Sequence, residues 1–181
     1  MKGIIEFLKV VLLCVFASIV YGIVHDQFTA RICLEYFTVF HPRIFPTQSP
    51  TLLAFGWGIL ATWWVGAFLG LLLALAARIG PKPKLTARDI FPYVTRLLLV
   101  MGATALVAGV IGFLLAKRGL IDPPGFVAQT PHLVVSNFMA DWWAHSASYA
   151  SGFFGGLALC VLIYRKRTRL ARTIKRELIS N

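Results

Sequence analysis

Residues 51–77, TLLAFGWGILATWWVGAFLGLLLALAA, contain no charged side chain over 27 positions. A helix needs about 20 consecutive apolar residues to cross the hydrocarbon core of a bilayer. Three further runs, at residues 4–24, 93–116 and 139–164, come close to the same composition. The sequence therefore predicts an all-α integral membrane protein in which four transmembrane helices form a bundle.

The composition of the whole chain supports this fold class. Of its 181 residues, 58% are hydrophobic and only 14% are charged, although the net charge is +11. A soluble domain usually carries about 25% charged residues. A protein that binds nucleic acid through this much positive charge would be polar, not rich in Leu, Phe and Trp. We therefore expect membrane lipid as the environment and no nucleic-acid partner.

The positions of lysine and arginine predict the orientation. If both termini are cytoplasmic, 14 of the 18 basic residues lie inside, and the outer loops hold only Arg31, Arg43, Lys117 and Arg118. Short cytoplasmic loops carry such an excess. We expect a single multi-pass domain over residues 1–181 in a bacterial-type inner membrane, with outer loops at 25–50 and 117–138 and a basic tail at 165–181. Residues 10–24 also resemble a signal peptide, but no small-residue cleavage motif follows them.

The outer loops carry two local signals. Residues 28–36 alternate apolar and polar side chains, which is typical of a half-buried β-strand. Phe28, Ile32 and Glu35 would equally suit a short interfacial helix. In the second loop, Thr130 and Pro131 resemble an N-cap and a first-turn proline, so we expect the last helix to begin outside the membrane.

Small residues predict which helix faces pack. In lipid, helices associate where small side chains allow their backbones to approach. The fourth span repeats such residues every four positions, at Ala140, Ala144, Ser148, Gly152 and Gly156. This stripe should face inward, and similar seams could join copies of the chain or a larger membrane complex. The neighbouring stripe holds Asn137, Asp141, His145 and Tyr149.

The candidate site is a set of polar side chains on the outer side, where all four histidines are expected. Counting residues along the first and fourth spans places His25 and His145 at the same depth, at the outer edge of the hydrocarbon. Imidazole and carboxylate ligands suit divalent zinc, iron, manganese or copper. We therefore predict a metal site formed by His25, Asp26, Glu35, His41, Asp141 and His145.

Other interpretations of these residues stay open, because no specific metal-binding motif is present. Asp141 could pair with Arg31 or Arg43, and His25 with Asp26 could terminate the first helix. The same groups could also form a proton or substrate site without metal. We expect His132 to face elsewhere. Cys14 and Cys160 should pack within spans, whereas Cys33 is a ligand, a reactive thiol or a packed residue.

Three functions are compatible with the sequence. The first is a membrane-embedded oxidoreductase or hydrolase that acts on a lipid or another amphipathic substrate at the metal site. The second is a non-catalytic accessory or assembly subunit of a larger membrane complex. The third is a small transporter, which is disfavoured because residues 51–77 offer little polarity for a translocation path.

Overall fold

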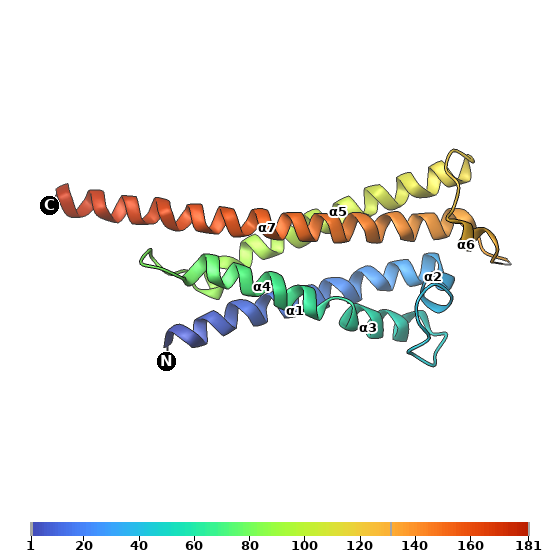
Figure 1. Ribbon diagram of the computed structural model, residues 1–181, viewed down its shortest axis with the longest axis horizontal. Coiled ribbons are helices and arrows are strands. Elements are labelled where there is room, and N and C mark those ends of the chain that lie inside the picture. Colours follow the sequence, from blue (N-terminus) through green and yellow to red (C-terminus); the bar gives the residue numbers. More distant parts are fainter. Residues whose placement is uncertain (1, 131, 181) are drawn as a thin grey trace.

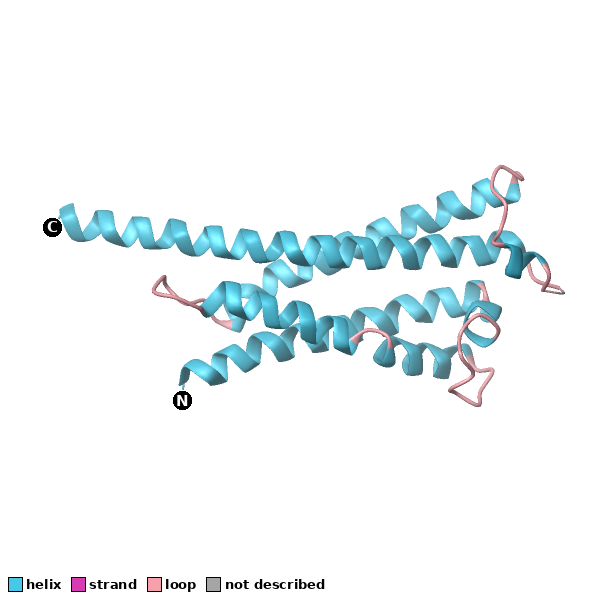
Figure 2. Ribbon diagram, in the orientation of Figure 1, coloured by secondary structure: helices cyan, strands magenta, loops and turns pink. Residues whose placement is uncertain are grey.

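The computed structural model describes residues 2–130 and 132–180, and every regular element in them is a helix (Figures 1 and 2). The elements are α1 (Lys2–Ile32), α2 (Leu34–Thr38), α3 (Pro50–Leu60), α4 (Trp63–Arg78), α5 (Ala87–Lys117), α6 (Gly125–Ala128) and α7 (Val135–Ser180). Four helical segments, α1, α3 with α4, α5 and α7, are long and apolar enough to cross a membrane. The expected all-helical architecture with four long apolar helices, compatible with a membrane bundle, is confirmed.

Both ends of the chain lie at one end of the bundle, together with the connection at residues 79–86 (Figure 1). We call this the terminal end. The connections at residues 33–49, 118–130 and 132–134 lie at the opposite end, which we call the loop end. Helices α5 and α7 run side by side, while α1 packs along α3 and α4. The bundle is thus two helical groups that join along their length.

The predicted β-strand at residues 28–36 is wrong. Helix α1 continues to Ile32, only Cys33 has an extended backbone, and α2 follows at once. The buried side chains recur with helical spacing, at Asp26, Thr29, Ala30, Cys33, Tyr36 and Phe37. Polarity alternates over these nine residues, as in a strand, because some apolar side chains of the helix, such as Phe28 and Ile32, are exposed. Such exposure is expected of residues that face lipid.

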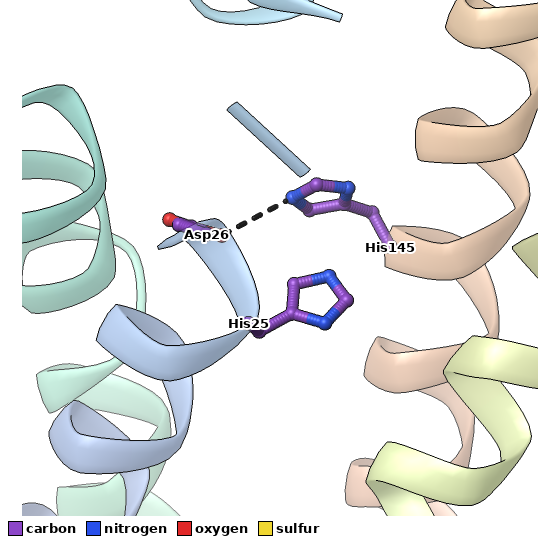
Figure 3. Close-up of side chains that lie close together, drawn as sticks. All are labelled: His25, Asp26 and His145. Carbon is purple, nitrogen blue, oxygen red and sulfur yellow. Dashed lines mark ion pairs between the residues drawn. The ribbon is translucent and has the colours of Figure 1, made fainter. Parts of the chain in front are cut away.

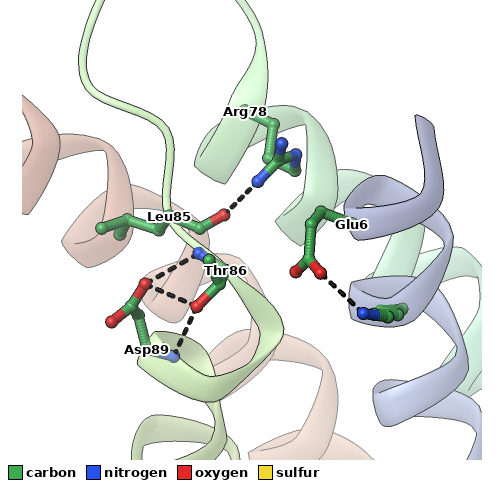
Figure 4. A network of polar contacts seen from close by, with 6 residues as sticks. Glu6, Arg78, Leu85, Thr86 and Asp89 are labelled. Carbon is green, nitrogen blue, oxygen red and sulfur yellow. Dashed lines mark hydrogen bonds and ion pairs between the residues drawn. The ribbon is translucent and has the colours of Figure 1, made fainter. Parts of the chain in front are cut away.

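Helix α5 begins before the apolar run that signals it. Thr86 and Asp89 form a capping box, in which the Thr86 backbone N–H donates to Asp89 Oδ2 at 2.8 Å (Figure 4). The Arg78 guanidinium also donates to the Leu85 carbonyl at 2.6 Å. The first turn of α5 contains the charged residues Arg88 and Asp89, so a count of apolar residues does not detect where the helix begins. Pro92 lies inside the helix.

Helix α7 begins at Val135. Thr130 precedes it by five residues and is therefore not its N-cap, and Pro131 lies outside the described residues. The helix is 46 residues long, which corresponds to about 69 Å. It runs past the terminal end of the bundle as a basic, mostly exposed segment (Figure 1).

Small residues make the helix contacts, as expected. All five residues of the α7 stripe are buried. Opposite them, a Cβ built at Gly112 of α5 would lie 2.7 Å from the Met139 carbonyl oxygen. On the other side of the bundle, a Cβ at Gly66 of α4 would lie 2.7 Å from the Cys14 carbonyl oxygen of α1. Helix backbones therefore touch at these positions.

The second apolar segment is broken between α3 and α4 at Ala61 and Thr62. A broken helix is tolerated in a membrane when neighbouring side chains satisfy the freed backbone groups. Here the Thr62 backbone N–H donates to the Ile59 carbonyl, and the Gly58 carbonyl accepts from the Thr62 hydroxyl instead. The Ser18 hydroxyl of α1 also lies 3.1 Å from the Thr62 carbonyl. The break could not be predicted from hydropathy, because the segment is apolar on both sides of it.

Arg167 ties α7 to the end of α4. Its side chain is completely buried and donates to the carbonyls of Ala76, Ile79, Lys82 and Pro83 at 2.7–3.0 Å. The last carbonyls of a helix lack internal partners and carry partial negative charge. One guanidinium thus caps α4 and holds the connection that follows it.

We predict that Arg167→Met destabilises the protein. Methionine keeps most of the side-chain volume but removes every donor, so buried carbonyls lose charged hydrogen bonds at a cost of about 3 kcal/mol. The apparent melting temperature in detergent should fall. Arg169→Met, at an exposed position of the same helix, is the control and should leave it unchanged. Equal melting temperatures would contradict the capping role.

We also predict that Gly66→Ala weakens the contact between α1 and α4. The new methyl group would overlap the Cys14 and Val15 backbone, and such overpacking costs about 1–3 kcal/mol. Gly102→Ala adds the same methyl group where nothing lies within 4 Å. Thermal unfolding in detergent should show a loss for the first variant and none for the second.

Candidate metal centre

Two helices bring three ligand-type side chains together near the loop end of the bundle. His25 and Asp26 come from α1, and His145 comes from α7 (Figure 3). One ligand atom from each residue lies within 4.8 Å of the others. The rings of His25 and His145 meet edge to face, with centroids 4.6 Å apart. The two histidines therefore share one depth and one interior site, as the residue count along each span predicts.

Asp26 and His145 make the closest contact. Asp26 Oδ1 lies 3.4 Å from His145 Nε2, and the two residues are only 6% and 5% exposed. On the far side of the ring, His145 Nδ1 lies 2.8 Å from the Asp141 carbonyl oxygen. A carbonyl oxygen only accepts, so Nδ1 carries the proton and donates.

This hydrogen bond decides which nitrogen of the His145 ring meets Asp26. With the proton on Nδ1, Nε2 presents a lone pair to a carboxylate oxygen, which is also an acceptor. Two facing acceptors need a proton or a cation between them. Histidines that bind metals characteristically donate their other N–H to a carbonyl or carboxylate, which fixes the ring orientation. The geometry of His145 is compatible with a metal ligand, and a proton on Nε2 would instead give an ion pair with Asp26.

Three other buried polar atoms at this site have no hydrogen-bond partner among the described residues. They are His25 Nε2 and both carboxylate oxygens of Asp141. Buried polar atoms in folded proteins are nearly always paired. Arg31 donates to Gln27 and Thr51, so its suggested pairing with Asp141 is wrong. The site thus contains buried nitrogen and oxygen atoms that form no hydrogen bond with the described residues and that could bind a cation.

His41 approaches the cluster from the connection between α2 and α3. Its Nδ1 lies 2.7 Å from the Tyr36 carbonyl oxygen and donates to it. The ring packs against Trp57, with centroids 4.7 Å apart. Burial lowers the pKa of His41 below its usual value, so the ring is neutral at pH 7. Its Nε2 therefore carries a lone pair, close enough to interact electrostatically with Asp26 and His145.

Aromatic side chains that were not predicted from the sequence enclose the histidines. Tyr21 stacks on His25 at a centroid distance of 5.7 Å, and Tyr36 stacks on His145 at 4.6 Å. Phe37 also contacts the His145 ring, at 5.8 Å. Tyr21 precedes His25 by four residues, so helical spacing could have identified it. Tyr36 could not be placed while its segment was treated as a strand.

The remaining candidate residues have different positions. Asp141 is completely buried beside the cluster but is not one of the three converging residues. Glu35 accepts a hydrogen bond from Cys33 Sγ at 3.6 Å and lies outside the convergence. His132 is exposed. His25 and Asp26 do not terminate α1, because the helix continues to Ile32.

Cys33 is a packed residue. It is buried in the hydrophobic cluster at the loop end, next to Phe37 and Phe138. Burial raises the pKa of its thiol to about 12, so the reactive thiolate is absent at neutral pH.

The arrangement is two imidazoles and one carboxylate in a buried, aromatic-walled site, with a third imidazole and a second carboxylate beside them. No protein-family model matches this chain, and neither curated proteins nor solved structures give a significant match to it.

Proposed function

We propose that this protein is a membrane-embedded metalloprotein that binds a divalent transition-metal ion through His25, Asp26 and His145. The observation that carries the proposal is their convergence from two helices 119 residues apart in sequence, counted from Asp26 to His145, with ligand atoms within 4.8 Å. Imidazole with carboxylate is a ligand set for zinc, iron, manganese or copper.

The spacing of the ligand atoms supports coordination. Ligands about 2.1 Å from a tetrahedral ion lie roughly 3.4 Å from one another. His145 Nε2 and Asp26 Oδ1 are 3.4 Å apart. His25 needs a side-chain rotation to close the third distance, and its Nε2 forms no hydrogen bond that would oppose this movement.

Three protein ligands favour a catalytic rather than a structural ion. Structural zinc sites have four protein ligands, whereas catalytic sites keep a position for water or substrate. Two histidines and one carboxylate also form the ligand set of non-haem iron oxygenases. We therefore propose an oxidoreductase or a hydrolase. Asp141 and His41 flank the ion, where they can bind a proton or the substrate.

The proposed location is a bacterial-type inner membrane with both termini in the cytoplasm. The support is the distribution of charge: 14 of 18 basic residues belong to the terminal end in this orientation, and four to the loop end. The positive-inside rule places the richer end in the cytoplasm. The metal centre then lies near the outer face.

We predict that protein purified without chelator contains about one equivalent of metal per chain, measured by inductively coupled plasma mass spectrometry. His25→Ala, Asp26→Ala and His145→Ala should each reduce metal affinity by at least 10–100-fold, because each removes a ligand. His132→Ala is the matched control, since His132 is exposed and outside the cluster. Its metal content should equal that of the unmodified protein.

Two results would overturn the proposal. One is the absence of bound metal after purification and after incubation with zinc, iron(II), manganese and copper salts in turn. The other is equal metal content in His25→Ala, His145→Ala and the control. Melting temperatures of all variants must accompany these measurements, so that unfolding is not mistaken for ligand loss.

Acid should release the metal. Imidazole binds a cation only when neutral, so protonation competes with coordination as the pH falls. The metal binds the folded protein, so the melting temperature should fall over the same pH range. Dialysis at stepwise lower pH, followed by metal analysis, checks the expectation. A constant metal content down to about pH 4, where carboxylates also protonate, would contradict it.

A further inference from the structure

A large apolar cavity lies beside the metal centre. Its volume is about 840 Å³, and α1, α4, α5 and α7 form most of its walls. Pockets for small molecules typically measure about 300–1,000 Å³. The cavity lies between the hydrophobic cluster of the terminal end, which includes Leu73 and Leu159, and that of the loop end, which includes Trp57.

The cavity ends against the walls of the metal centre. Tyr21, which stacks on His25, lines it, and so does Tyr149, whose ring centroid is 6.2 Å from that of His145. The Tyr21 and Ser148 hydroxyls, 2.8 Å apart, join α1 to α7 at this boundary. One layer of side chains therefore separates the cavity from the two histidines.

The cavity opens sideways between α4 and α7. Trp64 and Phe68 of α4 and Phe153 of α7 line it and are 55%, 50% and 44% exposed. In a membrane, these side chains face hydrocarbon. Leu73 and Leu159 line the interior and are only 3% and 6% exposed. A molecule dissolved in the bilayer can enter laterally, without crossing an aqueous surface.

The length and chemistry of the cavity fit one lipid chain. From Ser148 to Leu159 it follows α7 for about 17 Å, which is roughly half the 30 Å thickness of the hydrocarbon core. Two hydroxyls along this path are satisfied within the protein, because the Ser18 hydroxyl donates to Thr62 and the Thr62 hydroxyl to Gly58. The interior offers apolar contact to a chain and no pairing for a polar solute.

We infer that the substrate of the metal centre is an amphipathic lipid of the adjoining leaflet. Its apolar chain occupies the cavity, and its polar head reaches His25, Asp26 and His145 when the Tyr21 and Ser148 side chains, whose hydroxyls close this boundary, move apart. The position of the head rests on the proposed function, whereas binding of the chain rests on the cavity alone.

Photochemical cross-linking tests the position of the chain. The full chain is reconstituted in vesicles of phosphatidylethanolamine and phosphatidylglycerol that contain a phosphatidylcholine with a diazirine near the end of one acyl chain. After irradiation, mass spectrometry should find adducts on Leu73 and Leu159, which are shielded from surrounding lipid. A second probe, with the diazirine beside the head, should label Tyr149 instead.

Bulky substitutions provide the comparison. Ala17→Phe and Ala61→Phe place a ring at two separate positions of the cavity wall, and each should reduce labelling of Leu73 and Leu159 about tenfold. Ala103→Phe adds the same ring at an exposed position of α5 that does not line the cavity. This control should label like the unmodified protein. Two filling variants keep the test decisive if one fails to fold.

Metal analysis of the same samples separates the two proposals. Metal bound, with chain-probe adducts confined to outward-facing residues such as Leu99 and Leu106, overturns the lipid inference and leaves the metalloprotein intact. Interior adducts without any bound metal show a lipid-binding cavity but overturn both the metal centre and the lipid as its substrate. Metal together with interior adducts that the filling variants abolish supports the inference.

Discussion

Close approach of helix backbones at small residues is the contact on which the rest of this structure depends. In lipid, burial of apolar side chains gives helices little reason to associate, so packing contacts must supply the attraction. Gly66 and Gly70 bring α4 against α1, and Gly109 and Gly112 bring α5 against α7. The candidate metal site lies where these two groups face each other, since α1 contributes His25 and Asp26 and α7 contributes His145.

Buried polar groups are hydrogen-bonded at the terminal end of the bundle, whereas some at the loop end lack a partner among the described residues. At the terminal end, the Arg167 guanidinium donates to four carbonyls of the fold. Toward the loop end, His25 Nε2 and the Asp141 carboxylate have no partner among the described residues. A structure that pairs its polar groups so completely elsewhere leaves these atoms available for an ion or a substrate.

The middle of the bundle is not close-packed, because the apolar cavity lies there beside the candidate metal site. Protein interiors are normally filled to the density of organic crystals, yet an apolar space of about 840 Å³ lies beside the histidines. It is open toward lipid and closed by Tyr21 and Ser148 toward the site. Such a space costs packing contacts, and a bound lipid chain would restore them.

Much of the helix packing could be predicted from residue spacing, whereas the loop end could not. The stripe from Ala140 to Gly156 identified the buried face of α7, because small residues at four-residue intervals have one structural use in lipid. Residues 28–36 were predicted as a strand, because their polarity alternates. The prediction failed because the exposed face of this helical segment carries apolar side chains, as expected where a helix faces lipid and not water. The break at Ala61 and Thr62 left no hydropathy signal, since the segment is apolar on both sides of it.

By itself, the sequence determined four apolar helices, the inward face of the last one, and the common depth of His25 and His145. These properties follow from composition and from the rise and periodicity of a helix, which are local. Only the tertiary structure decided that Asp26 meets His145, that Glu35 lies apart, and that Tyr21 and Tyr36 wall the site. Those contacts depend on the rotation of each helix about its axis and on the path of the loops, which packing between distant segments sets.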